Sequence, residues 1–175
     1  MTEHTVNLAG GSAATTQSIT DALDLAEEIH NSMTVGQYNA YVYWWLVNSV
    51  GSNYYSGLLG TDNNPTYFGY AMAQYARFVR PGYQRTTATA NPQGSVFVSS
   101  YTGAVSGTAH YVIVAINAGT TAQNQEFQID NATLTSLTPY QTTATQNVAA
   151  QTPITVTSNT FSYTLPAQSI TTFVQ

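Results

Sequence analysis

The sequence predicts an α/β part followed by an all-β part within 175 residues. An aromatic run at residues 39–47 leads through a loop rich in Gly, Asn and Tyr into a helical pattern that ends at residues 76–83. After residue 84 the sequence consists of short strand-like segments separated by turn residues. A single strand–helix unit cannot bury both faces of its strand, because parallel strands are covered by helices and by neighbouring strands. We therefore expect the α/β part to be a portion of a larger fold.

The first helix is predicted over residues 18–33. Ser18 followed by Asp21 forms a capping-box-like start, and Asp21 also suits the positive end of the helix dipole. One side of this helix is apolar at helical spacing: Ile19, Ala22, Leu23, Ala26, Ile29 and Met33. The acidic residues Asp21, Asp24 and Glu28 are interpreted as a solvated opposite side.

The second helix is predicted over residues 65–80, with Asn64 as N-cap and Pro65 as the first helical residue. Its inward side consists of Phe68, Met72, Tyr75, Phe78 and Val79. Arg77 and Arg80 would then lie in the last turn, where cations oppose the negative end of the dipole. Gly69 costs about 1 kcal/mol relative to Ala inside a helix, so we expect another backbone to approach it closely.

The all-β part is predicted to be a β-sandwich. Its expected strands are residues 95–99, 109–118, 125–130, 154–157, 160–165 and 169–174. Apolar residues alternate with polar ones in two of them, at Phe127 and Ile129 and at Phe161, Tyr163 and Leu165, as in strands with one face in a core. Residues 132–153 are rich in Thr, Gln and Asn and are left unassigned. The domain boundary is placed between residues 1–83 and 84–175.

The composition restricts the function. The chain is 43% hydrophobic, which is enough for a core, but only 6% of its residues are charged and lysine is absent. Without a basic patch to neutralise phosphates, we exclude nucleic acid and anionic membrane surfaces as partners. The many Thr, Ser, Asn, Gln and Tyr side chains can hydrogen-bond neutral hydroxylated ligands, which favours a polysaccharide weakly. An inert secreted β-domain is the plainer interpretation.

The sequence has no cysteine, so neither a disulfide framework nor a thiolate metal site is expected. No stretch approaches the ~20 apolar residues that cross a bilayer. Met1 is followed by Thr2, Glu3 and His4 and not by a basic and then apolar leader. From the residues alone we expect either a cytoplasmic protein or a chain whose true N-terminus lies upstream.

Metal and nucleotide motifs are missing from the sequence, so no metal and no cofactor is predicted. It contains no His-Glu-x-x-His and no phosphate-binding loop, and its three histidines are scattered. A Ser-His-Asp constellation stays open, although no Gly-x-Ser-x-Gly motif supports it.

Glu3 is the remaining candidate for chemistry. A carboxylate so close to a terminus is ordinarily solvated and idle. Glu3, however, precedes a glycine pair and the first helix, so it lies at the C-terminal end of a strand, where βα barrels carry catalytic residues. Residues 38–47, a nearly continuous apolar run predicted to be a strand buried on both faces, would be the next strand. Trp44, Trp45 and Asn48 would then lie beside Glu3. Because Trp44 and Trp45 are adjacent, we expect their side chains to point to opposite faces, with at most one of them at the site.

Four segments together resemble glycoside hydrolase family 30, specifically the C-terminal part of its bacterial xylanase-like branch. They are residues 1–4 (Met-Thr-Glu-His), 39–45 (Asn-Ala-Tyr-Val-Tyr-Trp-Trp), 70–83 (ending in Ala-Arg-Phe-Val-Arg-Pro-Gly-Tyr) and 165–174 (Leu-Pro-Ala-Gln-Ser-Ile-Thr-Thr-Phe-Val). The resemblance implies part of a (β/α)8 barrel, from the end of strand 7 to helix 8, followed by a side β-sandwich. It also implies a secreted, retaining endo-β-1,4-xylanase-like enzyme that acts on xylan without a cofactor.

The resemblance assigns site residues as well. It implies that Glu3 is the nucleophile. It also implies that substrate is bound by Trp44 above all, together with Tyr43, Trp45, His4 and Asn48.

The sequence departs from the family in two respects. The acid/base residue of the family comes from the fourth strand, which residues 1–83 do not include, so we expect that a missing N-terminal barrel portion is required and that this chain alone is inactive. Glucuronoxylan-directed members carry an arginine after the aromatic residues of strand 8, where this chain has Val47 and Asn48. We therefore expect no dependence on glucuronate side groups.

Two alternatives stay open. One is a non-catalytic carbohydrate-binding or structural β-module, with residues 1–83 as a remnant. The other is a related glycosidase that acts on another β-linked glycan, because fold does not settle function.

Overall fold

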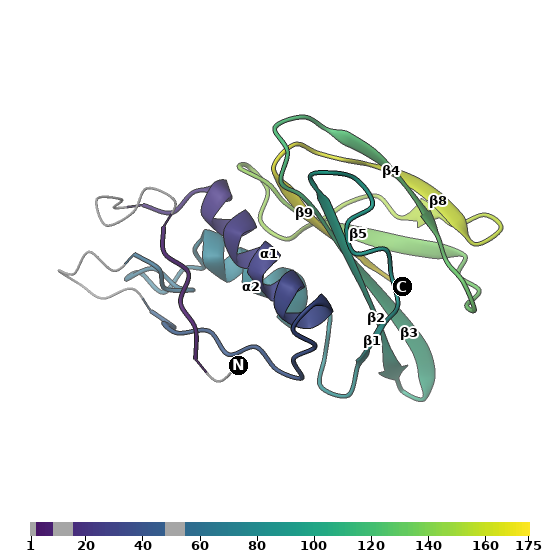
Figure 1. The fold of residues 1–175 in the computed structure, drawn as a ribbon, viewed down its shortest axis with the longest axis horizontal. Coiled ribbons are helices and arrows are strands. Elements are labelled where there is room, and N and C mark those ends of the chain that lie inside the picture. Colours follow the sequence, from purple (N-terminus) through teal and green to yellow (C-terminus); the bar gives the residue numbers. More distant parts are fainter. Residues whose placement is uncertain (1–2, 9–15, 48–54) are drawn as a thin grey trace. The chain divides into compact units, whose positions relative to one another are not determined.

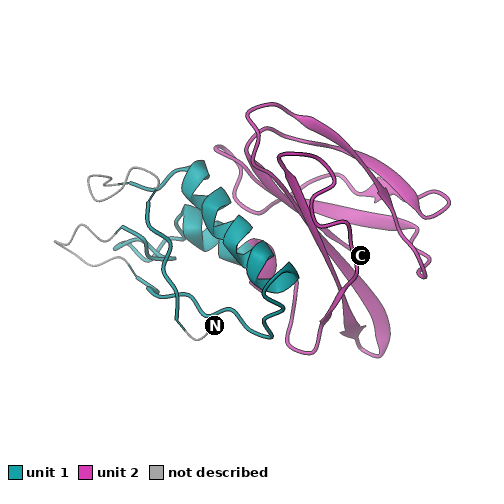
Figure 2. Cartoon of the chain, in the orientation of Figure 1, with its two compact units in different colours: residues 1–73 teal, residues 74–175 magenta. Residues whose placement is uncertain are grey.

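The computed structural model describes residues 3–8, 16–47 and 55–175. It contains two compact units, residues 1–73 and residues 74–175 (Figure 2). Unit 1 holds helix α1 (Ile19–Thr34) and the first part of helix α2 (Tyr67–Ala76), and unit 2 holds the strands (Figure 1). This division into compact units falls inside α2. The predicted boundary between residues 83 and 84 is of another kind, because it separates a barrel segment from a side domain, and it stays a prediction. None of the described helices is long and apolar enough to cross a membrane.

Helix α1 begins as the sequence predicts. Ser18 has an extended backbone, and its N–H and Oγ–H donate to the Asp21 carboxylate at 2.6 and 2.7 Å. The solvated-side interpretation is wrong for Asp21, which is only 2% exposed. The carboxylate turns back over the helix end because it satisfies the free backbone donor of the cap there. Asp24 is exposed as expected.

Helix α2 begins later than the sequence predicts. It starts at Tyr67, and its N-cap is Thr66, whose Oγ1 accepts a hydrogen bond from the Gly69 N–H at 3.2 Å. The prediction of Asn64 as N-cap and Pro65 as first helical residue is therefore wrong. The Thr66 hydroxyl also lies 2.7 Å from the Gly57 carbonyl oxygen, so a contact with a preceding segment selects the cap.

The end of α2 also differs from the prediction. The helix ends at Ala76, so Arg77 and Arg80 follow it and do not form its last turn. Arg80 still donates from Nη1 to the Ala76 carbonyl at 2.6 Å, which satisfies a terminal acceptor. The close approach expected at Gly69 is confirmed, because a Cβ there would lie 2.2 Å from the Leu58 carbonyl oxygen.

Residues 38–47 do not form a regular strand. They make isolated parallel bridges only, between Tyr43 and His4 and between Val47 and Leu59. The segment is only partly covered: Tyr41, Tyr43 and Trp45 are half-buried, whereas Val42, Trp44 and Leu46 are 50%, 48% and 65% exposed. The prediction of burial on both faces is therefore wrong, because the described part of the chain covers the segment only in part.

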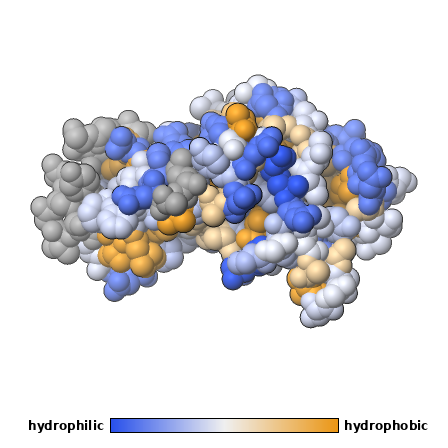
Figure 3. Space-filling model, turned by 60° about the horizontal axis from the view of Figure 1, so that its bottom comes forward, coloured by the Kyte–Doolittle hydropathy of each residue, from blue (hydrophilic) through white to orange (hydrophobic). Residues whose placement is uncertain are grey.

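Exposed large hydrophobic side chains concentrate in this part of unit 1. Among the described residues they are Val35, Tyr38, Val42, Trp44, Leu46, Val47 and, in unit 2, Val105. On the face drawn in Figure 3, hydrophobic residues form separate patches among polar ones. A run of exposed apolar residues on one extended segment is a feature of binding and packing surfaces.

Unit 2 is a β-sandwich of antiparallel strands, as predicted (Figure 1). In the described chain its larger sheet has the order β1 (Gln84–Thr86), β2 (Val96–Val105), β3 (Thr108–Asn117), β9 (Ser169–Val174), β5 (Ser136–Thr142), β6 (Ala149–Ala150), with β7 (Ile154–Thr155) paired to β5. The smaller sheet consists of β4 (Gln123–Gln128) and β8 (Thr160–Leu165). The predicted bounds of β8 and β9 are confirmed, and β5 lies in the stretch left unassigned.

The core of unit 2 lies between these sheets. Phe127 and Phe161 of the small sheet stack with ring centroids 4.6 Å apart, and Phe173 of the large sheet meets both edge-on at 5.3 Å. The alternation seen in the sequence therefore does mark the inward faces. Gln74, the first residue of this unit, is fully buried, and its side-chain amide lies 2.8 Å from Thr142 Oγ1 and 2.6 Å from Thr172 Oγ1.

Candidate active site

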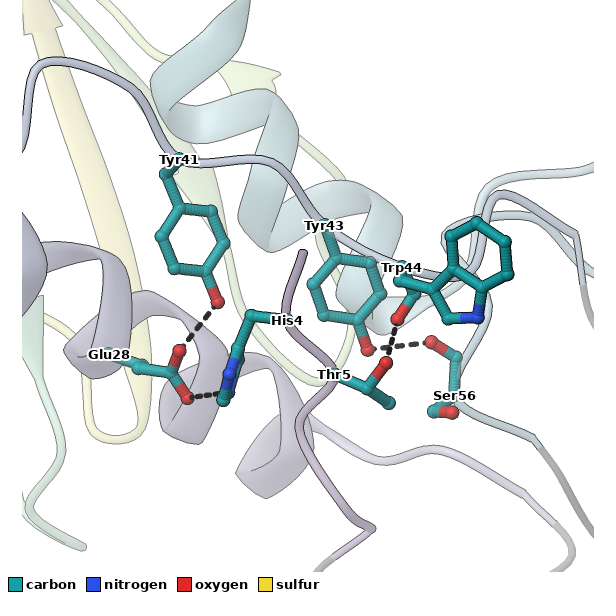
Figure 4. A network of polar contacts seen from close by, with 7 residues as sticks. All are labelled: His4, Thr5, Glu28, Tyr41, Tyr43, Trp44 and Ser56. Atoms are coloured by element: carbon teal, nitrogen blue, oxygen red, sulfur yellow. Dashed lines mark hydrogen bonds and ion pairs between the residues drawn. The ribbon is translucent and has the colours of Figure 1, made fainter. Parts of the chain in front are cut away.

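Two extended segments of unit 1 run side by side at the candidate site. His4 and Tyr43 form a parallel bridge, and the Trp44 N–H donates to the His4 carbonyl at 2.7 Å. The Thr5 hydroxyl donates to the Trp44 carbonyl (Figure 4). The segment that carries Glu3 is thus hydrogen-bonded in parallel to the aromatic segment, as expected for neighbouring strands of a barrel.

The side chains of His4, Tyr41 and Tyr43 are engaged on the covered side of these segments. His4 Nε2 lies 2.7 Å from Glu28 Oε2 of α1, and the Tyr41 hydroxyl donates to Glu28 Oε1 at 2.7 Å (Figure 4). The Tyr43 hydroxyl donates to the Ser56 carbonyl at 2.7 Å, and its ring lies 5.8 Å from that of Phe68. Three aromatic side chains of the site region therefore pack and hydrogen-bond within unit 1.

Glu3 and Trp44 are more exposed than these residues. Glu3 is exposed, and Trp44 is 48% exposed. The rings of Trp44 and Trp45 lie only 5.3 Å apart, so the expectation that they point to opposite faces is wrong. Side chains alternate in a regular strand, but the chain bends at Trp44. Asn48, the remaining predicted ligand, lies outside the described residues.

The pKa values of the Tyr41 and Tyr43 hydroxyls are raised by burial, and that of Tyr41 also by its hydrogen bond with the Glu28 carboxylate. Burial, the hydrogen bond to Glu28 and the charge of Glu28 raise the pKa of Tyr41 far above its ordinary value. Burial also raises the pKa of Tyr43 strongly, although a hydrogen bond with the Val6 backbone acts in the opposite direction. Both hydroxyls therefore stay protonated at neutral pH and act as donors.

The other carboxyl groups described in unit 1 differ in how their surroundings set the pKa. Asp62 is fully exposed, and it accepts hydrogen bonds from the Asn64 side chain and backbone, which lower its pKa. A group held as a carboxylate in this way is a poor proton donor. Partial burial raises the pKa of Glu27 on α1, and the charge of Asp24 adds to this effect. Across the described ranges, no group of three or more His, Cys, Asp or Glu side chains could hold a metal ion.

The sequence interpretation missed Glu28 and Tyr41. Glu28 was assigned to a solvated side, yet it is only 30% exposed and has two partners. A signal was present, because Asp21, Leu25 and Glu28 are spaced four and three residues apart and so share one stripe of α1, on which Leu25 is fully buried.

A parallel pair of extended segments packed on helices and followed by a β-sandwich is the arrangement of a partial barrel with a β domain. No family model matches the chain. Over 154 residues, 88% of the chain, it is 40% identical to Glucuronoxylanase XynC of Bacillus subtilis (strain 168). It covers 34% of that protein, so the chain spans about a third of the length of the curated relatives it matches.

Solved structures agree with this relationship. A GH30 endoxylanase from Clostridium papyrosolvens C71 matches with a TM-score of 0.83 and 40% identity, over 99% of this chain and 40% of that one. The glycoside hydrolase family 30 subfamily 8 xylanase Xyn30A from Clostridium acetobutylicum matches with a TM-score of 0.83 and 39% identity, over 99% of this chain and 41% of that one. The chain is therefore a homologue of the family 30 xylanases over part of their length, with the fold of a partial (β/α)8 barrel and a β domain.

Proposed function

We propose that this chain is the nucleophile-bearing part of a retaining, xylan-degrading glycoside hydrolase, with Glu3 as the nucleophile. The observation that carries the proposal is the parallel pairing of the segment after Glu3 with the aromatic segment at Tyr43 and Trp44. It brings an exposed carboxylate and an exposed indole to one edge of unit 1. The xylanase names of the relatives support the substrate class.

The chemistry assigned to Glu3 is attack on the anomeric carbon, which forms a covalent glycosyl-enzyme that water then hydrolyses. A second carboxyl group about 5 Å away must protonate the leaving oxygen and later activate the water. The sequence has eight acidic residues. Apart from Glu3 they lie on α1, in the Asp62 turn or in unit 2. The proposal therefore requires an acid/base residue from a barrel portion outside this chain.

Trp44 is proposed as the platform for a sugar ring, since apolar ring faces stack on the C–H surfaces of pyranoses. Trp45, whose ring lies 5.3 Å from that of Trp44, is proposed to extend it. Tyr43 and His4 are proposed to shape the site from behind, through the contacts described above. A role for Asn48 stays a prediction. Secretion of the whole protein is also proposed, in line with the similarity to a conserved exported protein from Bacteroides fragilis at 25% identity.

A hybrid enzyme tests the nucleophile. In it, this chain replaces the matching segment of the Bacillus subtilis relative, which supplies the remainder of the barrel. We expect the hybrid to hydrolyse xylan and Glu3→Gln to lower kcat at least about 10³-fold, because loss of a nucleophile removes the covalent route. Asp62→Asn serves as a control that removes one carboxylate elsewhere in unit 1. Full activity of the Glu3→Gln hybrid would refute the assignment.

A second candidate function, carbohydrate binding without catalysis, is favoured by a cavity in unit 2. Its volume is about 930 Å³, within the range of about 300–1,000 Å³ that ligand pockets occupy. Its lining combines hydroxyl and amide groups with apolar rings: Thr86, Ser100, Thr102, Gln125, Tyr111 and Phe127. Titration calorimetry of the chain with xylo-oligosaccharides tests it. We expect binding of xylo-oligosaccharides to be lost in Gln125→Ala and kept in the exposed Ser162→Ala control. This result, together with a hybrid enzyme that does not hydrolyse xylan, would favour carbohydrate binding over catalysis.

A further inference from the structure

Glu28 binds two side chains that come from two different segments. Its Oε2 lies 2.7 Å from His4 Nε2, and its Oε1 accepts the Tyr41 hydroxyl at 2.7 Å (Figure 4). His4 precedes α1 in the chain and Tyr41 follows it. The rings of His4 and Tyr41 also meet edge-on, with centroids 6.2 Å apart. One carboxylate thus ties the segment before the helix to the segment after it.

The directions of the hydrogen bonds in this cluster follow from the chemistry of its groups. An ionised carboxylate only accepts hydrogen bonds, so His4 Nε2 must carry a hydrogen toward Glu28. The sequence places no Lys or Arg before Arg77, so no lysine or arginine of unit 1 competes for the Glu28 charge. Hydrogen bonds to an ionised acceptor are roughly twice as strong as neutral ones. The side chains of His4 and Glu28 are only 33% and 30% exposed, so water competes little for the contact between them.

The position of Glu28 excludes it as the missing acid/base. Both of its oxygens are occupied, and it contacts the side chain of His4, which is next to Glu3 in an extended segment. The Glu28 carboxylate is therefore already engaged by His4 and Tyr41. Glu28 contacts the side chain of His4, which directly follows the proposed nucleophile Glu3 in the sequence.

We propose that Glu28 is a positioning residue for Glu3. By fixing the His4 ring and the Tyr41 hydroxyl together, it sets the register of the Glu3 segment against the aromatic segment. The Trp44 N–H to His4 carbonyl bond of 2.7 Å is the backbone contact that this arrangement maintains. The expected effect of Glu28 on the reaction rate rests on the proposed function, in which Glu3 is the nucleophile. The structural part of the inference concerns this chain alone.

Nuclear magnetic resonance of the 175-residue chain tests the structural part. Glu28→Gln preserves the shape of the side chain and removes its charge, Glu28→Ala removes both acceptors, and Asp24→Asn is a matched control on the exposed side of α1. We expect the wild type and Asp24→Asn to show the His4 ring with its hydrogen on Nε2. We expect Glu28→Ala to lose this signature and to exchange the Trp44 amide at least about 10-fold faster, as in local opening.

Amide exchange in β3 of unit 2, for example at Val114, controls for global unfolding, and a His4→Gln variant assigns the ring signals. Unchanged His4 signals and unchanged Trp44 exchange in both Glu28 variants would overturn the inference. Acceleration at Val114 as large as at Trp44 would overturn it as well, because the effect would then be a loss of the whole fold.

Kinetics of the hybrid enzyme test the catalytic part. A small displacement of a reacting group costs up to about 10²-fold in rate, so Glu28→Gln should lower kcat about 10- to 100-fold with KM changed less than about 2-fold. A rise in KM at constant kcat, or an equal loss in Asp24→Asn, would overturn it. If Glu3→Gln stays active while the His4 signature is intact, the proposed nucleophile fails. If Glu3→Gln is inactive while Glu28→Gln behaves as wild type, only the positioning role fails.

Discussion

At the scale of single residues, the aromatic segment contains both half-buried side chains with internal partners and side chains exposed to solvent. Tyr43 donates to the Ser56 carbonyl at 2.7 Å and packs near Phe68. Trp44 is 48% exposed, and its ring contacts that of Trp45. Adjacent positions in one sequence motif therefore have different physical tasks. The sequence could identify the motif, but the division depends on where α2 and the segment at Ser56 lie.

This division predicts opposite outcomes for two substitutions. Tyr43→Phe leaves a partly buried carbonyl without its donor and should cost about 1 kcal/mol of unfolding free energy, with kcat/KM of the hybrid enzyme nearly unchanged. Trp44→Ala should leave unfolding almost unchanged and lower kcat/KM about 10-fold or more, because it removes a stacking surface. Urea unfolding and initial rates on xylan measure both. The reverse pattern would show that Tyr43 holds substrate and that Trp44 belongs to the core.

At the scale of elements, α2 shows how a tertiary contact can decide a helix boundary. Asn64 before Pro65 has the local signature of a helix start. In the structure the Asn64 side chain donates to Asp62 Oδ2 at 2.8 Å, and Thr66 takes the capping role while its hydroxyl contacts the Gly57 carbonyl. Local spacing identified the helix and its close approach at Gly69, and the segment around Leu58 determined where the helix begins.

The cap assignment can be measured. Thr66→Ala should destabilise the chain by about 1 kcal/mol, as loss of an N-cap does, and it also removes the contact with Gly57. Asn64→Ala is the matched control and should cost clearly less, because Asn64 is exposed and bonds only within its turn. Urea unfolding followed by circular dichroism gives both values. Equal losses would mean that the cap lies at Asn64, as the sequence suggested.

Local pattern predicted some elements well and others poorly, for identifiable reasons. The bounds of α1 were predicted to within one residue, since Ser18 and Asp21 form a self-contained cap. Strand β5 was missed because its inward positions include polar residues. Gln141 is buried but donates to the Tyr163 hydroxyl at 2.9 Å, a partner from β8 that the local sequence does not reveal. At the candidate site, the sequence points to Glu3 and Trp44, whose roles stay predictions, and it gives no sign of the contacts of Glu28, because those partners come from segments before and after its helix.

At the scale of the whole molecule, the proposed chemistry is incomplete. The only acidic residue proposed at the site is Glu3, and the chain spans about a third of its curated relatives. We expect the purified 175-residue chain to release no reducing sugar from xylan, because a retaining mechanism needs a second carboxyl group about 5 Å from the nucleophile. The hybrid enzyme is the positive control. Turnover by the chain alone that Glu3→Gln abolishes would show that its own acids suffice.

The preference for side groups is also a property of the whole molecule, and it provides the last prediction. The resemblance places an arginine of glucuronoxylan-directed enzymes at Val47 or Asn48, and Val47 is 36% exposed. Neither residue can form the charge-assisted fork with a uronate carboxylate that arginine forms. The hybrid enzyme should therefore cut unsubstituted xylan and glucuronoxylan at similar rates, with product lengths that do not follow the uronate spacing.

The control for this prediction is a substitution that restores the charge. Val47→Arg and Asn48→Arg are made separately in the hybrid enzyme, and one of them should raise kcat/KM on glucuronoxylan relative to unsubstituted xylan about 10-fold or more, as a fully formed charged contact does. Mass spectrometry of the products, with the Bacillus subtilis relative measured alongside, separates the outcomes. If the unmodified hybrid already gives uronate-spaced products, recognition of the uronate comes from the barrel portion supplied by the relative, and the prediction is wrong.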